Sequence, residues 1–351
     1  MPVPKAEPVP HFEIAGHSVA PGTSETIDIP VSRLPTNIEV SMRVRVVHGK
    51  KPGPVMFVSG CVHGDEIIGV EVVRRLLREV KPKRLAGTLL CIPVVNSYGF
   101  VAHQRYLPDR RDLNRCFPGS AKGSLASQLA YRFTQEILAR CSIGIDLHSA
   151  GLHRENLPQI RISENRPVAA ELAPVFGAPA IIVSKLREGS LRQAAADHDC
   201  DVLLLEAGEA LRFDELSMRV GVQGILRVMH HLGMGVRLPR KAGAKSVVSR
   251  RTSWLRAPEG GIFRAVKASG SFVEASDVVG YLADPFGDTD IEVNSPVAGV
   301  IIGRSNLPVV NQGDALVHIA EVEIPATAED RLNDIEEAAF ADGLFDEDEI
   351  V

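Results

Sequence analysis

Residues 55–80 read VMFVSGCVHGDEIIGVEVVRRLLREV. The first six residues form a short and almost wholly apolar run, which is typical of a β-strand buried on both faces. From Ile67 onward the apolar residues recur at helical spacing, and basic residues gather toward the end, where the helix dipole favours them. The segment therefore predicts a buried strand that leads directly into a helix.

Buried strands and helices continue to alternate as far as residue 232. Strands are expected at 88–95, 142–148, 158–163, 180–184 and 202–208, and helices at about 124–140, 166–176, 190–198 and 213–232, with an irregular stretch over 96–119. This alternation predicts an α/β fold with a mixed, mostly parallel sheet flanked by helices. In open α/β sheets ligands bind beyond the carboxyl ends of the strands, so functional residues are expected at strand ends.

The segments on either side suggest how the chain is divided. The α/β unit is expected to span 1–238, with residues 1–50 as an N-terminal β extension because they hold two extended segments. Residues 239–256 are basic, show little helical pattern and contain the only Trp, which predicts a linker. Short alternating strands punctuated by glycine over 257–320 predict a small all-β C-terminal domain, a sandwich or barrel. Residues 321–351 are interpreted as an acidic tail.

Composition and charge limit the class of protein. Hydrophobic residues are 45% and charged residues 24% of the 351, which excludes the collagen-like, disordered and disulfide-scaffold classes. The tail has a charge of −11 within a net charge of −5, so the other 320 residues carry +6. No basic run interleaved with aromatics marks a nucleic-acid surface, and no run approaches the roughly 18 apolar residues of a membrane span. Five scattered cysteines without a CxxC pair, and a first dozen residues unlike a signal peptide, predict a cytoplasmic protein that binds neither nucleic acid nor membrane.

His63 and Glu66 lie where the first buried strand turns into its helix. Residues three apart in such a turn face the same side, so an imidazole and a carboxylate can bind one metal ion. The HxxE spacing alone is weak, because about one chance match is expected in a chain with 11 histidines, and His318 with Glu321 also matches. The position at a strand end between glycines favours the first pair, whereas His318 lies inside a predicted strand.

His148 directly follows the apolar strand over 142–147. Its ring is expected at the same edge of the sheet as His63, where it would complete the three protein ligands of a catalytic zinc site. The alternative for His148 is a hydrogen-bonded core histidine. Asp146, two residues earlier on the same face, is a candidate to orient an imidazole.

Glu206 comes straight after four apolar residues at another strand end, which makes it a candidate base for metal-assisted hydrolysis. The alternative for Glu206 is a salt bridge at the strand end, and Glu209 is interpreted as a loop residue. The irregular segment over 103–119 gathers side chains suited to anions or amides, with a solvated surface loop as the alternative. These side chains are Arg105, Arg110, Arg111, Asn114 and Arg115.

Four segments occur in an order and spacing that resemble one enzyme family. They read GCVHGDE at 60–66, RDLNRCFPG at 111–119, IDLHSAG at 145–151 and LLLEAG at 203–208. Together they resemble the succinylglutamate desuccinylase/aspartoacylase family, zinc-dependent amidohydrolases with a carboxypeptidase-like fold and a β-rich C-terminal domain. The resemblance covers about residues 50–320, and the FPG ending is closer to the branch with acyl-diaminobutyrate deacetylases than to aspartoacylase itself.

The resemblance implies one zinc ion per chain, held by His63, Glu66 and His148, and hydrolysis of a small N-acyl amino acid or related carboxylated amide. Its remaining assignments are Glu206 as the base that activates water, Arg105 on the scissile carbonyl, and Asn114, Arg115 and Arg192 on substrate carboxylates. A small-peptide zinc carboxypeptidase and a non-catalytic metal- or ligand-binding relative stay as alternatives.

Residues 273–301 also look like a lipoyl or biotinyl hairpin. Such carriers need a lysine at the hairpin tip, and this chain has Asn294, Ser295 and Pro296 there, so no attached cofactor is expected. We expect the C-terminal domain to pack against the active site and shape it. Exposed edge strands leave a homodimer or higher homo-oligomer open.

Overall fold

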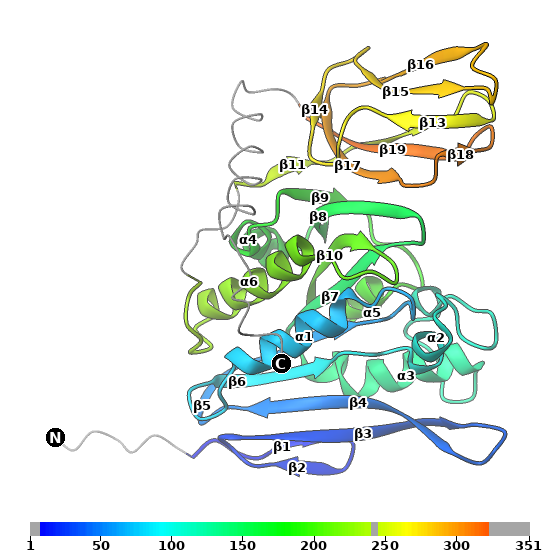
Figure 1. The fold of residues 1–351 in the computed structure, drawn as a ribbon. Helices are drawn as coiled ribbons and strands as arrows, with labels where there is room; N and C mark the ends of the chain where they lie inside the picture. The colour runs from blue at the N-terminus through cyan, green and yellow to red at the C-terminus, as the bar shows by residue number, and fades with distance from the viewer. Residues whose placement is uncertain (1–7, 240–244, 323–351) are drawn as a thin grey trace, which may run out of the picture.

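The structure, a computed structural model, describes residues 8–239 and 245–322. Its centre is a large mixed sheet with helices packed against it, and a smaller sheet formed by C-terminal strands packs at one end (Figure 1). The helices are α1 (Ile68–Glu79), α2 (Ser97–Ala102), α3 (Leu125–Glu136), α4 (Pro167–Phe176), α5 (Leu191–Asp197) and α6 (Glu215–His231), and the 3₁₀ turns are η1 (Leu113–Arg115) and η2 (Leu138–Arg140). The α/β class predicted from the sequence is confirmed.

Thirteen of the described strands belong to the large sheet. Ten of them lie side by side in the order β12 (Thr252–Arg256), β19 (Ala315–Glu321), β17 (Gly299–Ser305), β8 (Arg154–Ser163), β10 (Asp201–Glu209), β7 (Ile143–Ala150), β5 (Lys51–Gly60), β6 (Ala86–Ile92), β4 (Glu39–His48) and β3 (Thr23–Arg33). The others are β9 (Ala180–Ser184) and β11 (Val247–Ser249), which extend from β8, and β14 (Phe272–Val273), which pairs with β17. The central pairs β6–β5, β5–β7 and β7–β10 are parallel, whereas β8 joins β10 and β17 antiparallel. The predicted parallel sheet therefore occupies the centre, and antiparallel strands extend it on both sides.

The strand predicted at the start of residues 55–80 is buried on both faces because it lies in this parallel centre. Alternate side chains of a strand point to opposite faces. Met56 and Val58 accordingly pack into the core beneath α1, α4 and α6, while Phe57 packs into a second core with α3 and α5. On α1, Val72 and Leu76 lie on the face turned to the first core. The apolar residues at helical spacing therefore pack α1, the helix that follows His63 and Glu66, against the first core.

The C-terminal strands form two packed sheets, which confirms the predicted all-β character of this part. The four-stranded antiparallel sheet has the order β16 (Asp290–Asn294), β15 (Val278–Ala283), β13 (Gly261–Ala265) and β18 (Val309–Val310). It shares a hydrophobic core with β14, β17 and β19 of the large sheet, for example through Phe263, Leu282 and Ile301. Because β17 pairs with β8, the C-terminal strands continue the main sheet beyond β8.

Two segments differ from the sequence prediction. The linker predicted over 239–256 contains β11 and β12 beyond the undescribed residues 240–244. These strands pair with β9 and β19, and such distant partners leave no local pattern. The stretch over 96–119, predicted to be irregular, contains α2 and η1. Helix α2 begins where the side chain of Asn96 accepts a hydrogen bond from the backbone N–H of Gly99 at 2.9 Å.

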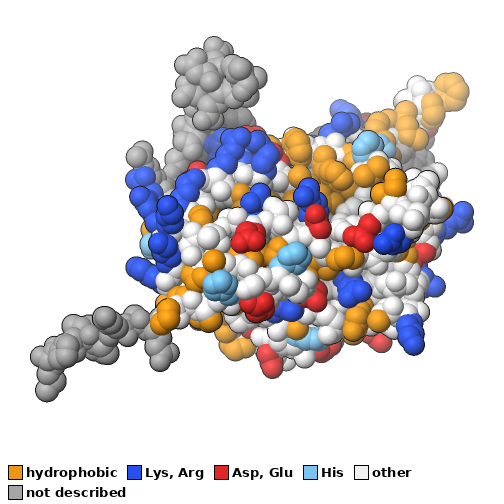
Figure 2. All heavy atoms as spheres, turned by 90° about the horizontal axis from the view of Figure 1, so that it is seen from below, with side chains coloured by type: hydrophobic (Ala, Val, Ile, Leu, Met, Phe, Trp, Pro, Cys, Tyr) orange, Lys and Arg blue, Asp and Glu red, His pale blue; other side chains and the backbone are white. Residues whose placement is uncertain are grey.

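The remaining described parts lie at the periphery. Strands β1 (Phe12–Ile14) and β2 (His17–Val19) form a separate hairpin, and β3 and β4 contain the two extended segments predicted within residues 1–50. The acidic tail predicted over 321–351 lies outside the described residues apart from its first two. On the face shown in Figure 2, acidic and basic side chains are interspersed with apolar groups. None of the described helices is long and apolar enough to cross a membrane.

Candidate active site

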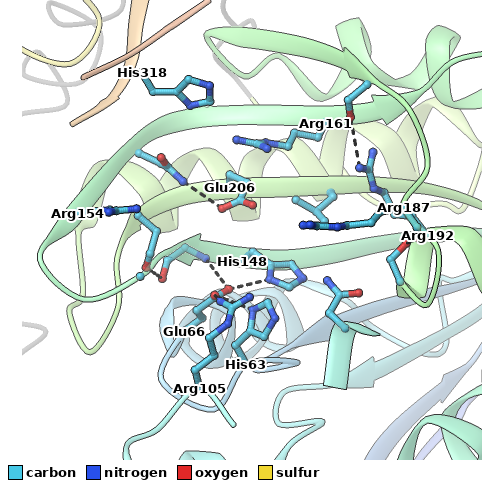
Figure 3. A pocket seen from close by; sticks show the side chains of 18 of the residues that line it. His63, Glu66, Arg105, His148, Arg154, Arg161, Arg187, Arg192, Glu206 and His318 are labelled. Carbon is cyan, nitrogen blue, oxygen red and sulfur yellow. Dashed lines mark hydrogen bonds and ion pairs between the residues drawn. The ribbon is translucent and has the colours of Figure 1, made fainter. Parts of the chain in front are cut away.

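Three neighbouring strands of the parallel centre end at one edge of the sheet, and the predicted site residues gather there (Figure 3). Strand register places Gly60 of β5 beside Leu147 of β7, and His148 of β7 beside Glu206 of β10. His63 follows the end of β5 by three residues. Strands far apart in sequence therefore bring these side chains to a common edge, as the strand-end argument predicted.

The turn between β5 and α1 holds His63 and Glu66 in a tightly constrained backbone. Cys61 has a φ of 51°, in the left-handed region that non-glycine residues seldom adopt. A Cβ atom at Gly64 would lie 2.0 Å from the carbonyl carbon of Gly99, so only glycine allows the turn to approach α2 this closely. The two predicted ligands thus sit on a turn whose path is fixed by backbone contacts.

His63, Glu66 and His148 form one buried group. Their potential ligand atoms all lie within 4.8 Å of one another. Nδ1 of His63 is 2.6 Å from Oε1 of Glu66, and Nδ1 of His148 is 2.7 Å from Oε2 of the same carboxylate. The two ring centroids are 5.0 Å apart. The structure therefore brings together the three residues that the sequence suggested as metal ligands.

Two further carboxylates hold the outer nitrogens of these imidazoles. Nε2 of His148 lies 2.8 Å from Oδ2 of Asp146, and Nε2 of His63 lies 3.1 Å from Oδ1 of Asp112. Catalytic zinc sites commonly use two histidines and one glutamate, with each histidine oriented by an outer hydrogen-bond acceptor. The residues present therefore fit a zinc ion in both their ligand types and their supporting contacts.

The electrostatics of this group suit a cation. Burial alone lowers the pKa of His148, but Asp146 and Glu66 outweigh it and hold that pKa well above its usual value. His63 has a raised pKa for the same reason, with Glu66 and Asp112 outweighing its burial. Burial favours the neutral form of Glu66, yet the two imidazoles hold the pKa of its carboxyl below the usual range. Glu66 is therefore an ionised carboxylate enclosed by nitrogen donors.

Arg105 joins the metal-site carboxylates from the other side. Its Nη1 donates to Oε1 of Glu66 and its Nη2 to Oδ2 of Asp112, both at 3.0 Å. The guanidinium thus lies beside the metal group, at the pocket wall shown in Figure 3. Asp112 contacts His63, Arg105 and the backbone N–H of Asn114, which makes it a central support of the site.

Glu206 lies on β10 and lines the pocket. Its Oε2 accepts a hydrogen bond from Nδ2 of Asn156 at 3.0 Å, and it has no salt bridge among the residues that the structure describes. The strand-end salt bridge considered for Glu206 is thus not formed within that part of the chain. Glu209, interpreted from the sequence as a loop residue, is instead the last residue of β10, where it pairs with Ala150 of β7. It accepts hydrogen bonds from the backbone N–H of His153 and from Nδ2 of Asn306.

A cavity of about 420 Å³ opens above the metal group and is strongly cationic. Seven basic side chains line it, against the two carboxylates Glu66 and Glu206. These basic residues are Arg105, Arg115, Arg154, Arg161, Lys185, Arg187 and Arg192. Such an excess of positive charge in a concave site favours an anionic ligand.

Asn114, Arg115 and Arg192 all line this cavity. Oδ1 of Asn114 accepts a hydrogen bond from the backbone N–H of Leu191 at 2.9 Å, which connects η1 to the start of α5. Nη2 of Arg192 donates to Oγ of Ser184 at 3.3 Å, while burial and the nearby charge of Arg161 lower the pKa of Arg192 to about 10. The two other arginines of the irregular segment, at positions 110 and 111, do not line the cavity and are surface residues.

Sequence reasoning missed several residues of the pocket. Asp112 lies within the motif over 111–119, which the sequence marks only by its basic and amide side chains. Arg161, Trp254 and His318 come from β8, β12 and β19, and no local motif surrounds them. The HxxE spacing of His318 and Glu321 does not mark a metal site among the described residues. His318 lies outside the metal group but lines the pocket. A histidine inside an otherwise apolar strand is the one feature of the sequence that indicates a buried polar residue at this position.

Known proteins resemble this chain in sequence and in fold. Residues 52–232 match the model of the succinylglutamate desuccinylase/aspartoacylase catalytic domain, which takes in the metal group and Glu206. The chain is 26% identical to the N-α-acetyl-L-2,4-diaminobutyric acid deacetylase of Halomonas elongata over 283 residues, which is 77% of this chain and 83% of that protein.

Solved structures share the fold over most of the chain. A succinylglutamate desuccinylase/aspartoacylase from Rhodobacter sphaeroides has a TM-score of 0.76 and 26% identity, and the match covers 86% of this chain and 96% of that one. The product-bound ectoine utilization protein of Ruegeria pomeroyi has a TM-score of 0.75 and 21% identity, covering 85% and 95%. The likeness to the second structure is one of fold.

Proposed function

Because the chain belongs to the succinylglutamate desuccinylase/aspartoacylase family, we propose that it is a zinc-dependent deacylase of small N-acyl amino acids or related carboxylated amides. The observation that carries this proposal is the buried group of His63, Glu66 and His148, with Glu206 on the adjacent strand in the same pocket. The cationic cavity around them supports a substrate with a carboxylate.

One zinc ion would be held by nitrogens of His63 and His148 and by the carboxylate of Glu66. Zinc in such a site lowers the pKa of water and polarises a carbonyl oxygen. Asp112 and Asp146 fix the two imidazole rings so that their Nδ1 atoms face the carboxylate of Glu66. The protein's contribution here is to hold three ligands in place and leave the cavity side open.

Glu206 takes the proton of the attacking water and returns it to the leaving amine. A carboxylate within reach of both groups can serve as base and then as acid in this way. The amide of Asn156 donates to one oxygen of Glu206 and so orients the carboxylate within the pocket. This support comes from β8, the antiparallel neighbour of β10.

Arg105 stabilises the negative oxygen that develops as the amide carbonyl is attacked. It lies beside Glu66 already, and its contacts with two carboxylates preset the orientation of its guanidinium. Asn114 and Arg115 hold a substrate carboxylate, with Arg192 as a further contact. A guanidinium suits this task because it can donate two parallel hydrogen bonds to one carboxylate.

The test is an activity screen with the zinc-loaded protein. Acetyl, succinyl and longer acyl derivatives of aspartate, glutamate, ornithine and 2,4-diaminobutyrate cover both the leaving amino acid and the acyl group. We expect release of a free amine from at least one of them, abolished by a chelator and restored by zinc. Absence of release from every member, with zinc bound in equal amount to protein, would contradict the proposal. Cleavage of dipeptides alone would favour a small-peptide carboxypeptidase.

A further inference from the structure

Five neighbouring strands contribute one residue each to a row that crosses the pocket face of the large sheet. Each member is directly opposite the next one in strand register, and directly opposed residues place their side chains on the same face. From β10 to β12 the row consists of Gly208, Asn156, Gly303, His318 and Trp254. Three of these residues line the pocket, which identifies the face. The row therefore connects the strand of Glu206 with the C-terminal strands.

A bulge in β8 brings Asn156 to this face. Glu206 is opposite Gln159, whereas Gly208 is opposite Asn156, so three steps along β8 match two steps along β10. Residues three apart in a regular strand point to opposite faces, and the extra residue of a bulge returns them to the same face. Asn156 thus lies diagonally across from Glu206, and its Nδ2 donates to Oε2 of Glu206 at 3.0 Å.

Gly303 of β17 provides the space for the Asn156 side chain. A Cβ atom at position 303 would lie 2.7 Å from Oδ1 of Asn156 and 3.0 Å from the backbone oxygen of Glu155, and real Cβ atoms essentially never show contacts below 3.0 Å. Gly303 is not among the glycines with positive φ, so its backbone conformation does not require glycine. The feature that requires glycine here is the close approach of the Asn156 amide.

The same amide group contacts both Gly303 and Glu206. Its oxygen and its nitrogen lie in one plane, so a shift of Oδ1 away from position 303 also moves Nδ2 relative to the carboxylate of Glu206. Among the described residues, Asn156 is the one hydrogen-bond donor to Glu206. The orientation of the carboxylate therefore depends on a contact whose geometry is limited by a C-terminal strand.

We propose that the C-terminal strands position the base of the reaction, because Gly303 leaves the space in which the amide of Asn156 reaches Glu206. Asn156 and Gly303 are positioning residues that act through Glu206 and not on the substrate. The inference rests on the proposed role of Glu206. It adds that the all-β part of the chain sets the rate of the chemical step, separately from substrate affinity.

The kinetic test is a double-mutant cycle on the full-length, zinc-loaded protein with Asn156→Ala, Gly303→Ala and the double variant. Each single variant should lower kcat about tenfold, as loss of a hydrogen bond to a charged group does, with KM and zinc content nearly unchanged. The double variant should be no slower than Asn156→Ala, because the added methyl group then meets no amide. Gly260→Ala, where the nearest atom would be 3.5 Å from the new Cβ, is the control and should keep the wild-type kcat.

A second readout does not depend on turnover. Selective ¹⁵N labelling of asparagine gives NMR signals of the side-chain amides, and the signal of Asn156 is the one missing from Asn156→Ala. We expect Glu206→Gln to shift this signal in the wild-type background and in the Gly260→Ala background. In the Gly303→Ala background the same substitution should leave the signal nearly in place, because the displaced amide no longer contacts residue 206.

Wild-type kcat in Gly303→Ala would overturn the proposal, and so would a full additional loss in the double variant, which would assign the effect to the backbone contact with Glu155. A rise in KM at constant kcat would make Asn156 a substrate contact instead. If Gly303→Ala does not fold, adding Asn156→Ala should restore folding, and failure to restore it would also count against the proposal.

The two readouts separate this inference from the proposed function. If no compound is hydrolysed, the deacylase assignment fails, while the NMR signal still decides whether Gly303 allows Asn156 to reach Glu206. An equal response to Glu206→Gln in the wild-type and Gly303→Ala backgrounds would contradict the positioning role even in an active enzyme.

Discussion

Glu206 is the residue on which the proposed chemistry depends most. It lies near the carboxyl end of β10, beside His148, but it is not part of the three-residue metal group. Glu206→Gln keeps the shape of the side chain and removes its ability to accept a proton. We expect the variant to retain one zinc per chain by elemental analysis and to lose about 10²–10⁴-fold in kcat. Near-wild-type turnover with bound zinc would remove Glu206 from the role of base.

Asp112 illustrates a support that the sequence did not reveal. Its carboxylate contacts Nε2 of His63 and Nη2 of Arg105, so it orients a proposed ligand and a proposed catalytic residue together. Asp112→Asn should weaken zinc binding by about 10–100-fold, as loss of such outer partners typically does. Competition with a chromogenic chelator measures this affinity. The exposed Asp288→Asn serves as control, and equal affinity in both variants would contradict the role.

Residue types and their spacing identified the metal group because the information is local. His63 and Glu66 are three residues apart, and His148 and Glu206 each follow an apolar strand. Asp112 lies next to basic residues in a segment with no regular pattern, and its contact with His63 spans 49 positions. Such a contact depends on the path of the chain, which residue spacing does not encode.

At the scale of elements, the turn between β5 and α1 is the part that tolerates least change. A methyl group at Gly64 would collide with backbone atoms of Gly99 rather than with a flexible side chain. Gly64→Ala should therefore displace His63 and Glu66, lower the thermal midpoint and reduce zinc content well below one per chain. Gly260→Ala, where the nearest atom would be 3.5 Å away, is the matched control. Full zinc content in Gly64→Ala would show that the close approach is not needed.

Elements with strong periodicity were predicted well, and the others were not. Strands β7, β9 and β10 and helices α4, α5 and α6 lie within a few residues of their predicted positions, because burial on one or both faces leaves a regular pattern. Helix α2 has only six residues and one fully buried position, so no period is visible. Strands β11 and β12 exist through pairing with β9 and β19, which is information about distant segments.

For the molecule as a whole, the continuous sheet explains why residues of the α/β part and residues of the C-terminal strands line the same pocket. β17 pairs with β8, and β19 and β12 follow, so Trp254 and His318 reach the same cavity as His63. The sequence predicted the α/β class and the all-β C-terminal part separately. The two parts join in one sheet through the pairing of β17 with β8. The sequence of either strand by itself does not indicate this pairing.

His318 also links the pocket to the stability of the whole chain. Burial and Arg161 hold its pKa at about 3, whereas an unfolded chain binds a proton near pH 6.5. Below that pH the unfolded state binds more protons, so this contribution to stability is lost as pH falls from 6.5 toward 3. From pH 7 to pH 4, His318→Phe should lose less unfolding free energy than wild type, by up to about 3 kcal/mol. Denaturant unfolding at both pH values measures this, with exposed His17→Gln as control, and identical losses in wild type and His318→Phe would contradict the prediction.

The most direct test of the central claim is turnover measured as a function of added zinc, with the metal-free protein as starting point and the best N-acyl amino acid from the screen as substrate. The account predicts that the rate of amine release rises linearly and reaches a plateau at one zinc per chain. His63→Ala and His148→Ala should show no such rise at the same zinc concentrations. Amine release that is independent of zinc, or that rises equally in the two histidine variants, would contradict the claim.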